Sequence, residues 1–423
     1  MRGLAQLLKI IFAMQIFTSA CTVQNSDVAE RVIRFDNSKV YPSLNLKLSD
    51  LADVSYVPLG GEEQINFLTP TFRLAQQCYI DSNYMVVPDA TPYRDVVSKS
   101  DDNIYFFNHS GEFVKSFGIG PKRAWDGNSY NHVKVISPGK IAVCLSIGEG
   151  PLVICDYNGN LLKKDTLIDG HNKISVMNGK LVLYDGLYKF LNGFDYYRGR
   201  AVDVYDVDTG VFIDFEDLTD VGMPGIKQFD PIKKEWWLYS TASRTYISNC
   251  RTNFVYALDT SLNIVPAFEY VHQGSKFPDE YLIVVPLIET DEYILFCNAM
   301  DYESQVKQRY KHGNWIFIKS EQKIYQLSDL GYLVDVMDDG RRHLMEEAFG
   351  SLVNDKVFFH TFCKTQNSDI LVMPVDVEIA KNYMDKLPDN IREQIQSKQP
   401  GDNPLLVVMK FGKSIGEIYK FKN

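Results

Sequence analysis

Short apolar segments separated by tight-turn residues recur along most of this chain. The clearest turns are NHSGEF (108–113), SPGKI (137–141), DYNGNL (156–161), MNGKL (177–181) and DVDTGV (206–211). Each turn lies between runs of residues that favour strands, which is the sequence pattern of β-hairpins. Helical periodicity is almost absent before residue 376, so the pattern predicts an all-β fold.

Grouped by their hairpins, the predicted strands fall into six units, at 66–118, 131–168, 172–218, 235–271, 281–328 and 343–422. Four antiparallel strands in repeats of about 40–50 residues are typical of β-propeller blades. The 25 Tyr and 25 Phe agree with this fold, because aromatic side chains suit half-buried pleated surfaces. We therefore expect one six-bladed propeller with four-stranded antiparallel blades over residues 34–423.

A propeller must join its last blade to its first, because otherwise a strand edge stays exposed. An apolar run from Val54 to Leu59 lies near the start of the predicted propeller, and another from Leu405 to Phe411 lies near the end of the chain. We expect the N-terminal strand to complete the last blade.

One segment of the last unit, 376–398, departs from the strand pattern. Val377, Ala380, Met384 and Leu387 follow helical spacing, and Pro388 interrupts them. The spacing predicts a short helical insertion within the last blade. An irregular charged loop is the alternative, because short isolated helices are marginal without packing.

The first 21 residues have the features of a secretory signal. Arg2 and Lys9 precede or flank an apolar stretch that is too short to span a membrane, and small residues lead to Cys21. This end resembles the lipobox of bacterial lipoproteins, in which the cysteine is lipidated. The resemblance implies a lipid anchor in a bacterial membrane, with the outer membrane favoured, a flexible tether over 22–33, and a mature chain in the periplasm or at the cell surface. An ordinary cleaved signal is the alternative.

The six other cysteines show neither a CxxC motif nor metal-ligand spacing. Most of them lie in apolar strand-like runs, where a cysteine is usually a small buried hydrophobe. Cys144 and Cys155 flank a four-residue loop at 148–151, which would place them opposite each other. A disulfide and two buried thiols are both left open for this pair.

Four stretches resemble the six-bladed β-propeller lipoproteins of Bacteroidetes, a family of TolB-like and NHL-like propellers of largely unknown function. They are LSDLADVSYVPLG (48–60), IYFFNHSGEFVKSFGIGPKRAW (104–125), FVYALDTSLNIVPAFEY (254–270) and DNPLLVVMKF (402–411). The resemblance implies the propeller fold and an envelope location. None of these stretches is catalytic, so it implies little about activity.

The predicted connections between blades gather on one face around the central channel, where ligands usually approach a propeller. They span 118–132, 168–173, 219–236, 272–281 and 328–343, and hold many aromatic, imidazole and charged side chains. The candidate ligand-binding residues among them are Trp125, His132, His171, Trp236, Trp237, His272, Arg341 and His343. Flat aromatics with charges of both signs suit a glycan, a peptide or a partner protein. The simpler interpretation is that loops are polar and that tryptophans at blade starts belong to the core.

Other functions have less support in the sequence. A formal net charge of −10 argues against a nucleic-acid partner. The histidines show no metal-ligand spacing and no catalytic motif is present, so we expect no metal, no cofactor and a binding module rather than an enzyme. The alternative is a metal-dependent hydrolase or lactonase at the channel mouth, with the acidic segment 335–343 as a source of carboxylates. Turn chemistry favours the simpler interpretation of that segment, a solvated turn with Asp-Gly at its tip.

Overall fold

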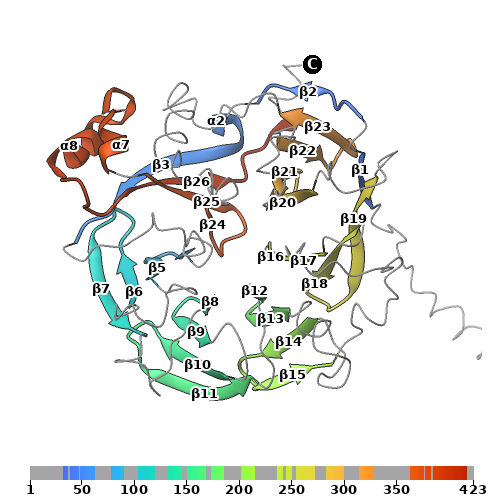
Figure 1. Ribbon diagram of the computed structural model, residues 1–423, viewed down its shortest axis with the longest axis horizontal. Helices are drawn as coiled ribbons and strands as arrows, with labels where there is room; N and C mark the ends of the chain where they lie inside the picture. Colours follow the sequence, from blue (N-terminus) through green and yellow to red (C-terminus); the bar gives the residue numbers. More distant parts are fainter. Residues whose placement is uncertain are drawn as a thin grey trace, which may run out of the picture.

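The structure is a computed structural model. It describes residues 32–36, 39–46, 48–61, 78–89, 103–119, 132–144, 150–167, 173–184, 202–214, 236–241, 244–249, 254–271, 283–299, 314–327, 363–375, 377–382 and 384–416. Six antiparallel sheets stand side by side in a closed ring (Figure 1). The predicted six-bladed propeller is confirmed.

Four strands of each sheet follow one another from the centre of the ring outward. Blade 1 comprises β4 (Tyr79–Ile80), β5 (Met85–Asp89), β6 (Asn103–Phe107) and β7 (Phe113–Gly118), and blade 2 comprises β8 (His132–Ser137), β9 (Lys140–Cys144), β10 (Gly150–Asp156) and β11 (Leu161–Leu167). Blade 3 comprises β12 (Lys173–Met177), β13 (Lys180–Tyr184), β14 (Val202–Asp206) and β15 (Val211–Ile213), and blade 4 comprises β16 (Trp236–Ser240), β17 (Arg244–Asn249), β18 (Phe254–Asp259) and β19 (Ile264–Val271). Blade 5 comprises β20 (Ile283–Glu289), β21 (Tyr293–Ala299), β22 (Asn314–Ile318) and β23 (Lys323–Leu327).

Blade 6 joins the two ends of the chain. It comprises β24 (Cys363–Lys364), β25 (Ile370–Val375), β26 (Leu405–Phe411) and the N-terminal strand β3 (Ala52–Pro58). β3 pairs antiparallel with the whole of β26, from Leu405 opposite Pro58 to Phe411 opposite Ala52. The predicted closure of the last blade by an N-terminal strand is therefore confirmed.

The segment before β3 forms a strap around the outside of two further blades, which the sequence did not predict. We call this segment, residues 33–51, the N-terminal strap. β1 (Ile33–Asp36) adds in parallel to β19 as a fifth strand of blade 4, and β2 (Ser43–Leu44) adds in parallel to β23 of blade 5. The short helix α2 (Leu48–Leu51) then leads into β3. Figure 1 shows β1 and β2 on the outer side of their blades.

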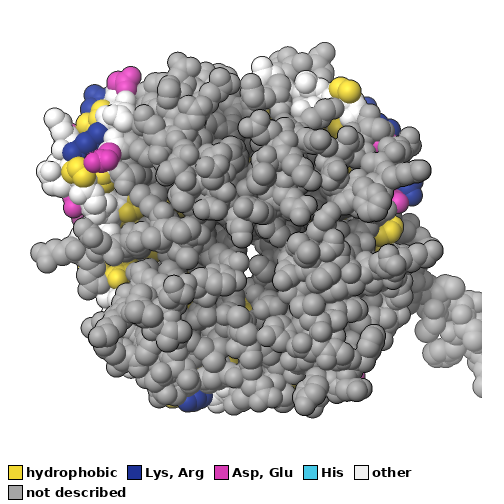
Figure 2. Space-filling model, in the orientation of Figure 1, with side chains coloured by type: hydrophobic (Ala, Val, Ile, Leu, Met, Phe, Trp, Pro, Cys, Tyr) yellow, Lys and Arg dark blue, Asp and Glu magenta, His cyan; other side chains and the backbone are white. Residues whose placement is uncertain are grey.

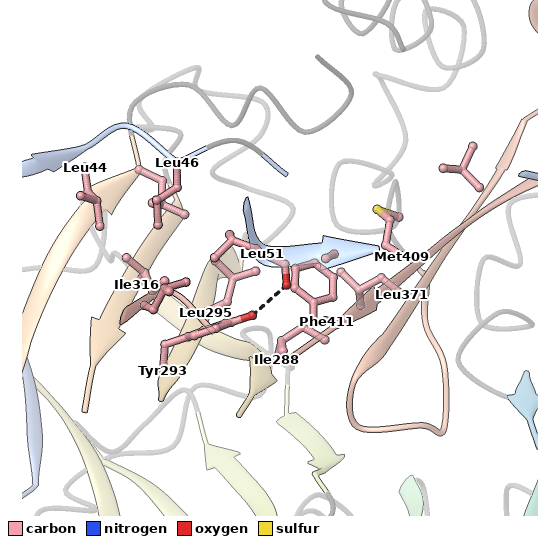
Figure 3. Close-up of a cluster of buried hydrophobic side chains, with 14 of the residues drawn as sticks. Leu44, Leu46, Leu51, Ile288, Tyr293, Leu295, Ile316, Leu371, Met409 and Phe411 are labelled. Atoms are coloured by element: carbon pink, nitrogen blue, oxygen red, sulfur yellow. Dashed lines mark hydrogen bonds between the residues drawn. The ribbon is translucent and has the colours of Figure 1, made fainter. Parts of the chain in front are cut away.

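Strap side chains enter the largest core cluster, between blades 5 and 6. Leu44, Leu46 and Leu51 are almost fully buried there beside residues of both blades. Figure 3 shows Leu51 close to Tyr293, whose hydroxyl donates a hydrogen bond to the Leu51 carbonyl oxygen at 3.2 Å. Five further clusters of buried side chains fill the other joints between blades. The hydrophobic core is thus divided among the six joints.

The predicted helical insertion is present between β25 and β26. It comprises α7 (Val377–Asn382), a 3-10 turn η4 (Met384–Lys386) and α8 (Asp389–Ser397). Pro388 caps α8 instead of entering it. The buried face of the insertion consists of Val377, Ala380, Leu387, Ile391 and Ile395. All of these except Val377 join the core cluster between blades 5 and 6.

The insertion also holds the ring closure. The Lys398 ammonium group, at the end of α8, donates to the Leu59 carbonyl oxygen at 2.6 Å, directly after β3. Arg392 donates to the carbonyl oxygens of Met384 and Leu387 and so fixes η4 against α8. No described helix is both long enough and apolar enough to cross a membrane.

Glycines in the outer turns let each blade approach the one before it. Gly111 and Gly159 have φ of 88° and 79° in the turns before β7 and β11. A Cβ at Gly111 would lie 2.3 Å from the Pro58 carbonyl oxygen, and one at Gly159 would lie 3.0 Å from the Phe117 ring. Blade 4 has Leu262 at the corresponding place, with φ of 67° and its side chain packed into the joint with blade 3.

The disulfide considered between Cys144 and Cys155 is excluded by the register of β9 and β10. Cys144 lies opposite Leu152, and Cys155 lies opposite Ile141. The two side chains also belong to different clusters, on opposite faces of blade 2. Both cysteines are free and buried, as is Cys78. The proposed facing geometry was wrong because β10 already begins at Gly150, within the residues taken as the loop.

Candidate functional site

The two faces of the ring differ in the length of their connections. Because strands alternate in direction, the first and third turns of blades 1 to 5 and the first turn of blade 6 lie on one face, which we call the turn face. These turns are short, as at 138–139, 157–160 and 178–179. The remaining connections leave from the opposite face, which we call the loop face, and include the long segments 119–131, 185–201, 214–235 and 328–362. The helical insertion connects strands on the loop face as well.

Most of the predicted binding residues lie outside the described part of the chain. These are Trp125, His171, His272, Arg341 and His343. The backbones of His132, Trp236 and Trp237 are described, and they begin the innermost strands β8 and β16 at the loop face. Their position agrees with a channel-mouth site, which stays a prediction. In the view of Figure 2, described surface gathers over the helical insertion at the upper left and again at the upper right, and basic and acidic side chains lie together in both places.

A hydroxyl chain links the innermost strands of blades 3 and 4. Ser175 of β12 and Ser240 of β16 are 2.6 Å apart through their Oγ atoms, and Ser240 is 2.6 Å from the Thr245 hydroxyl. A hydroxyl can donate to one neighbour and accept from another, so Ser240 can bond to both of the other hydroxyls at once. These hydrogen bonds therefore connect blade 3 to blade 4.

The first turn of blade 6 bridges to blades 1 and 2. Asn367 accepts from the Ile80 amide at 2.8 Å and donates to the Ile80 carbonyl at 2.7 Å, so its side chain extends the short strand β4. The side-chain oxygen of Gln366 accepts from the Val135 backbone N–H of β8 at 2.9 Å, and the backbone N–H of Gln366 donates to the Cys78 carbonyl oxygen at 2.8 Å. The side chains of Asn367 and Gln366 thus bond to backbone groups of neighbouring blades, which connects β4, β8 and β24.

A lysine and two thiols lie close to this turn. Lys134 of β8 is only 9% exposed. Burial raises the pKa of Cys78 and Cys144 to about 12, although the positive charge of Lys134 acts in the opposite direction on both. Since only the thiolate is a good nucleophile, neither cysteine is suited to covalent catalysis at neutral pH.

Tyrosine hydroxyls donate to carboxylates across three joints. Tyr157 donates to Asp81 between blades 2 and 1 at 2.7 Å, and Tyr205 donates to Asp165 between blades 3 and 2. Across the joint of blades 4 and 5, Tyr246 and Lys319 both bond to Glu289, whose side chain is 7% exposed. These hydrogen bonds link neighbouring blades within the joints, so they stabilise the ring. Sequence reasoning missed them, because the partners lie 40 to 76 residues apart.

The raised tyrosine pKa values predict a loss of stability in alkali. Burial, and next the bond to a carboxylate, raises the pKa of Tyr157 and Tyr205 above the ordinary value. Above about pH 10 the unfolded chain loses these protons while the folded chain keeps them. The folded state then binds more protons, so the free energy of unfolding falls as pH rises.

We expect urea denaturation between pH 9 and 11 to show this fall, at up to about 1.4 kcal/mol per pH unit for each retained proton. The variant Tyr157→Phe/Tyr205→Phe should be less stable at neutral pH but should show a shallower slope. An unchanged slope in that variant would contradict the assignment to these two joints.

Metal binding has no support among the described residues. No three side chains from His, Cys, Asp and Glu are grouped closely enough there to hold an ion. The hydroxyl, amide and tyrosine hydrogen bonds described above connect neighbouring blades, so they hold the scaffold from which the loop-face connections leave.

Comparisons with known proteins agree with the fold. No protein-family model matches the sequence, and no curated protein matches it. The chain resembles the solved structure of a Bacteroides fragilis protein described as exported, with 15% identity and a TM-score of 0.54 over 90% of this chain and all of that one. It is also similar to a DUF4221 family member from Bacteroides vulgatus, with 10% identity and a TM-score of 0.43 over 86% of this chain and 98% of that one. At 15% identity the likeness to the Bacteroides fragilis protein shows the propeller fold alone.

Proposed function

We propose that this protein is a lipid-anchored propeller of the bacterial cell envelope, which binds a glycan, a peptide or a partner protein with its loop face. The observation that carries the proposal is the difference between the two faces. Every long connection between described strands leaves from the loop face, whereas the turn face is made of short turns. Binding residues are most often found on loops that a rigid scaffold positions.

The joints supply the rigidity that such a scaffold needs. Each of the six joints has a buried apolar cluster, and the polar bonds of Tyr157, Tyr205, Tyr246, Tyr293 and Asn367 reinforce five of them. A preorganised scaffold loses little conformational entropy when it binds, which favours affinity. The exported Bacteroides protein with the same fold supports the envelope location.

Removing one loop-face aromatic should weaken binding more than removing an exposed turn-face side chain. We expect Trp125→Ala to raise the Kd of a ligand found by glycan array or envelope pull-down by about thirtyfold, which corresponds to about 2 kcal/mol. The control is His109→Ala, because His109 is exposed at the tip of a turn-face turn. Isothermal titration calorimetry measures both affinities, and thermal unfolding checks that both variants fold.

Equal affinities in the two variants would place the binding site away from Trp125 and contradict the proposal. If the protein instead converts the ligand to a product and this reaction requires added metal, the hydrolase or lactonase alternative holds in place of the binding function.

The anchor is tested separately. Diacylglycerol attaches to the sulfur of Cys21 in a lipoprotein, so Cys21→Ser should move the protein from the membrane fraction to the soluble fraction and abolish labelling with a fatty-acid probe. Wild-type protein that is carried through the same fractionation is the control. Membrane association and labelling that persist in Cys21→Ser would contradict the lipid anchor.

A further inference from the structure

The outer edge of a blade in this protein accepts an additional parallel strand. β1 occupies that edge on blade 4, with Ile33 to Asp36 opposite Phe268 to Val271 of β19. The Arg34 guanidinium group forms an ion pair with Glu269 at 2.7 Å across the added rung. Phe35 points toward blade 5 and packs on Phe296, with ring centroids 4.7 Å apart. The added strand thus combines one cross-strand ion pair with an apolar residue that reaches the next blade.

Blade 2 has the same edge geometry. A β-bulge interrupts the pairing of β19 with β18 just before Phe268, and an equivalent bulge interrupts the pairing of β11 with β10 just before Lys163. Aligning the two bulges places Lys163 at the position of Phe268 and Lys164 at that of Glu269. The rungs that β1 covers on blade 4 therefore correspond to 163–166 of β11.

This edge is open in the described part of the chain. β11 has seven residues and pairs there with β10, and no strand lies on its other side. Figure 1 shows it as the outermost ribbon of its blade. At its start Leu161 and Leu162 are 48% and 56% exposed, and Lys164 is exposed as well. The bulge explains the two leucines, because it turns consecutive side chains outward together.

We propose that β11 is a docking edge for an extended segment of a partner protein, which adds in parallel as a fifth strand of blade 2. Main-chain hydrogen bonds supply the affinity in strand addition, and alternate side chains supply the specificity. The segment carries a carboxylate opposite Lys164, because this rung repeats the Arg34–Glu269 ion pair with the two charges exchanged. Apolar residues on either side of that carboxylate would correspond to Ile33 and Phe35. This inference is independent of the loop-face proposal, since β11 lies on the perimeter of the ring.

The chain's own β1 supplies a matched pair of probes. One is a synthetic peptide of residues 30–39 that carries Arg34→Glu, and the other is the unmodified peptide. Both are tested by hydrogen–deuterium exchange on the intact mature protein and on its Lys164→Glu variant, at peptide concentrations up to about 1 mM. A third peptide, N-methylated at alternate amides, removes the main-chain donors. β1 itself is covalently attached, so its effective concentration prevents the peptides from displacing it on blade 4.

We expect the Arg34→Glu peptide to protect the amides of 163–167 in the wild-type protein, and the unmodified peptide to bind about threefold to fivefold more weakly. Lys164→Glu should reverse this preference, and the N-methylated peptide should give no protection. Three results would each overturn the proposal. They are a peptide preference that Lys164→Glu leaves unchanged, no protection of β11 by any peptide, and protection at a different edge. The proposal would also be overturned if the amides of β11 were protected without any peptide and this protection increased with protein concentration. The occupant would then be a second copy of this chain.

Discussion

Gly111→Ala should lower the free energy of unfolding by about 3 kcal/mol, the largest effect of any single methyl group that we expect in this chain. Gly111 has φ of 88°, where a side chain is strained. Its new Cβ would also lie 2.3 Å from the Pro58 carbonyl oxygen and 2.9 Å from Cγ1 of Val57. Both neighbours belong to the closing strand β3, so the methyl group would push the first blade away from the last.

The control for this substitution is Gly139→Ala. Gly139 has φ of 86°, nearly the same as Gly111, but no atom lies within 4 Å of the position of its Cβ. It should therefore show the backbone strain alone, about 1 kcal/mol. Chemical denaturation of both variants measures the difference. Equal losses in the two variants would mean that the contact between blade 1 and β3 contributes nothing to closure.

Leu51→Ala should lower the free energy of unfolding by about 3 kcal/mol, because it leaves a cavity where the strap enters the core. Leu51 is fully buried between blades 5 and 6. The bond that Tyr293 donates to the backbone oxygen of Leu51 does not involve the deleted atoms (Figure 3). The measured loss should therefore report mainly the packing of the strap.

Val40→Ala is the matched control on the same strap. Val40 is 87% exposed, so its truncation should change stability by less than about 0.5 kcal/mol. Urea titrations followed by tryptophan fluorescence compare the two variants. A small effect of Leu51→Ala, similar to that of Val40→Ala, would show that the strap lies on the ring without holding it closed.

Local sequence signals predicted the blades well, because turn chemistry acts over a few residues. Asn178 and Gly179 both have positive φ in the hairpin that MNGKL indicated, and Gly139 has it in SPGKI. The helical spacing of Val377, Ala380 and Leu387 likewise predicted the buried face of the insertion. In each case the residues that decide the conformation are close neighbours in the chain.

Contacts between distant segments could not be predicted in this way. β1 is four residues long and pairs with β19, more than 230 residues later in the chain, through backbone groups that every residue has. Asn367 and Ile80 are separated by 287 residues, and an asparagine in a turn is expected to serve that turn. The disulfide geometry failed for a related reason, since it depended on the strand boundary at Gly150. Three candidate site residues, His132, Trp236 and Trp237, lie at the starts of strands. The other five lie outside the described residues, in segments whose sequence has no periodic pattern to constrain position.

The most direct test of the loop-face proposal is site-specific photo-cross-linking in intact cells. A benzophenone amino acid replaces Trp125, which the proposal assigns to the loop face, in one strain and His109 on the turn face in another. The irradiated complexes are purified and identified by mass spectrometry. The proposal predicts that position 125 captures a reproducible envelope partner or glycan and that position 109 captures none of it. Capture of the same partner from position 109 and not from position 125 would contradict the proposal.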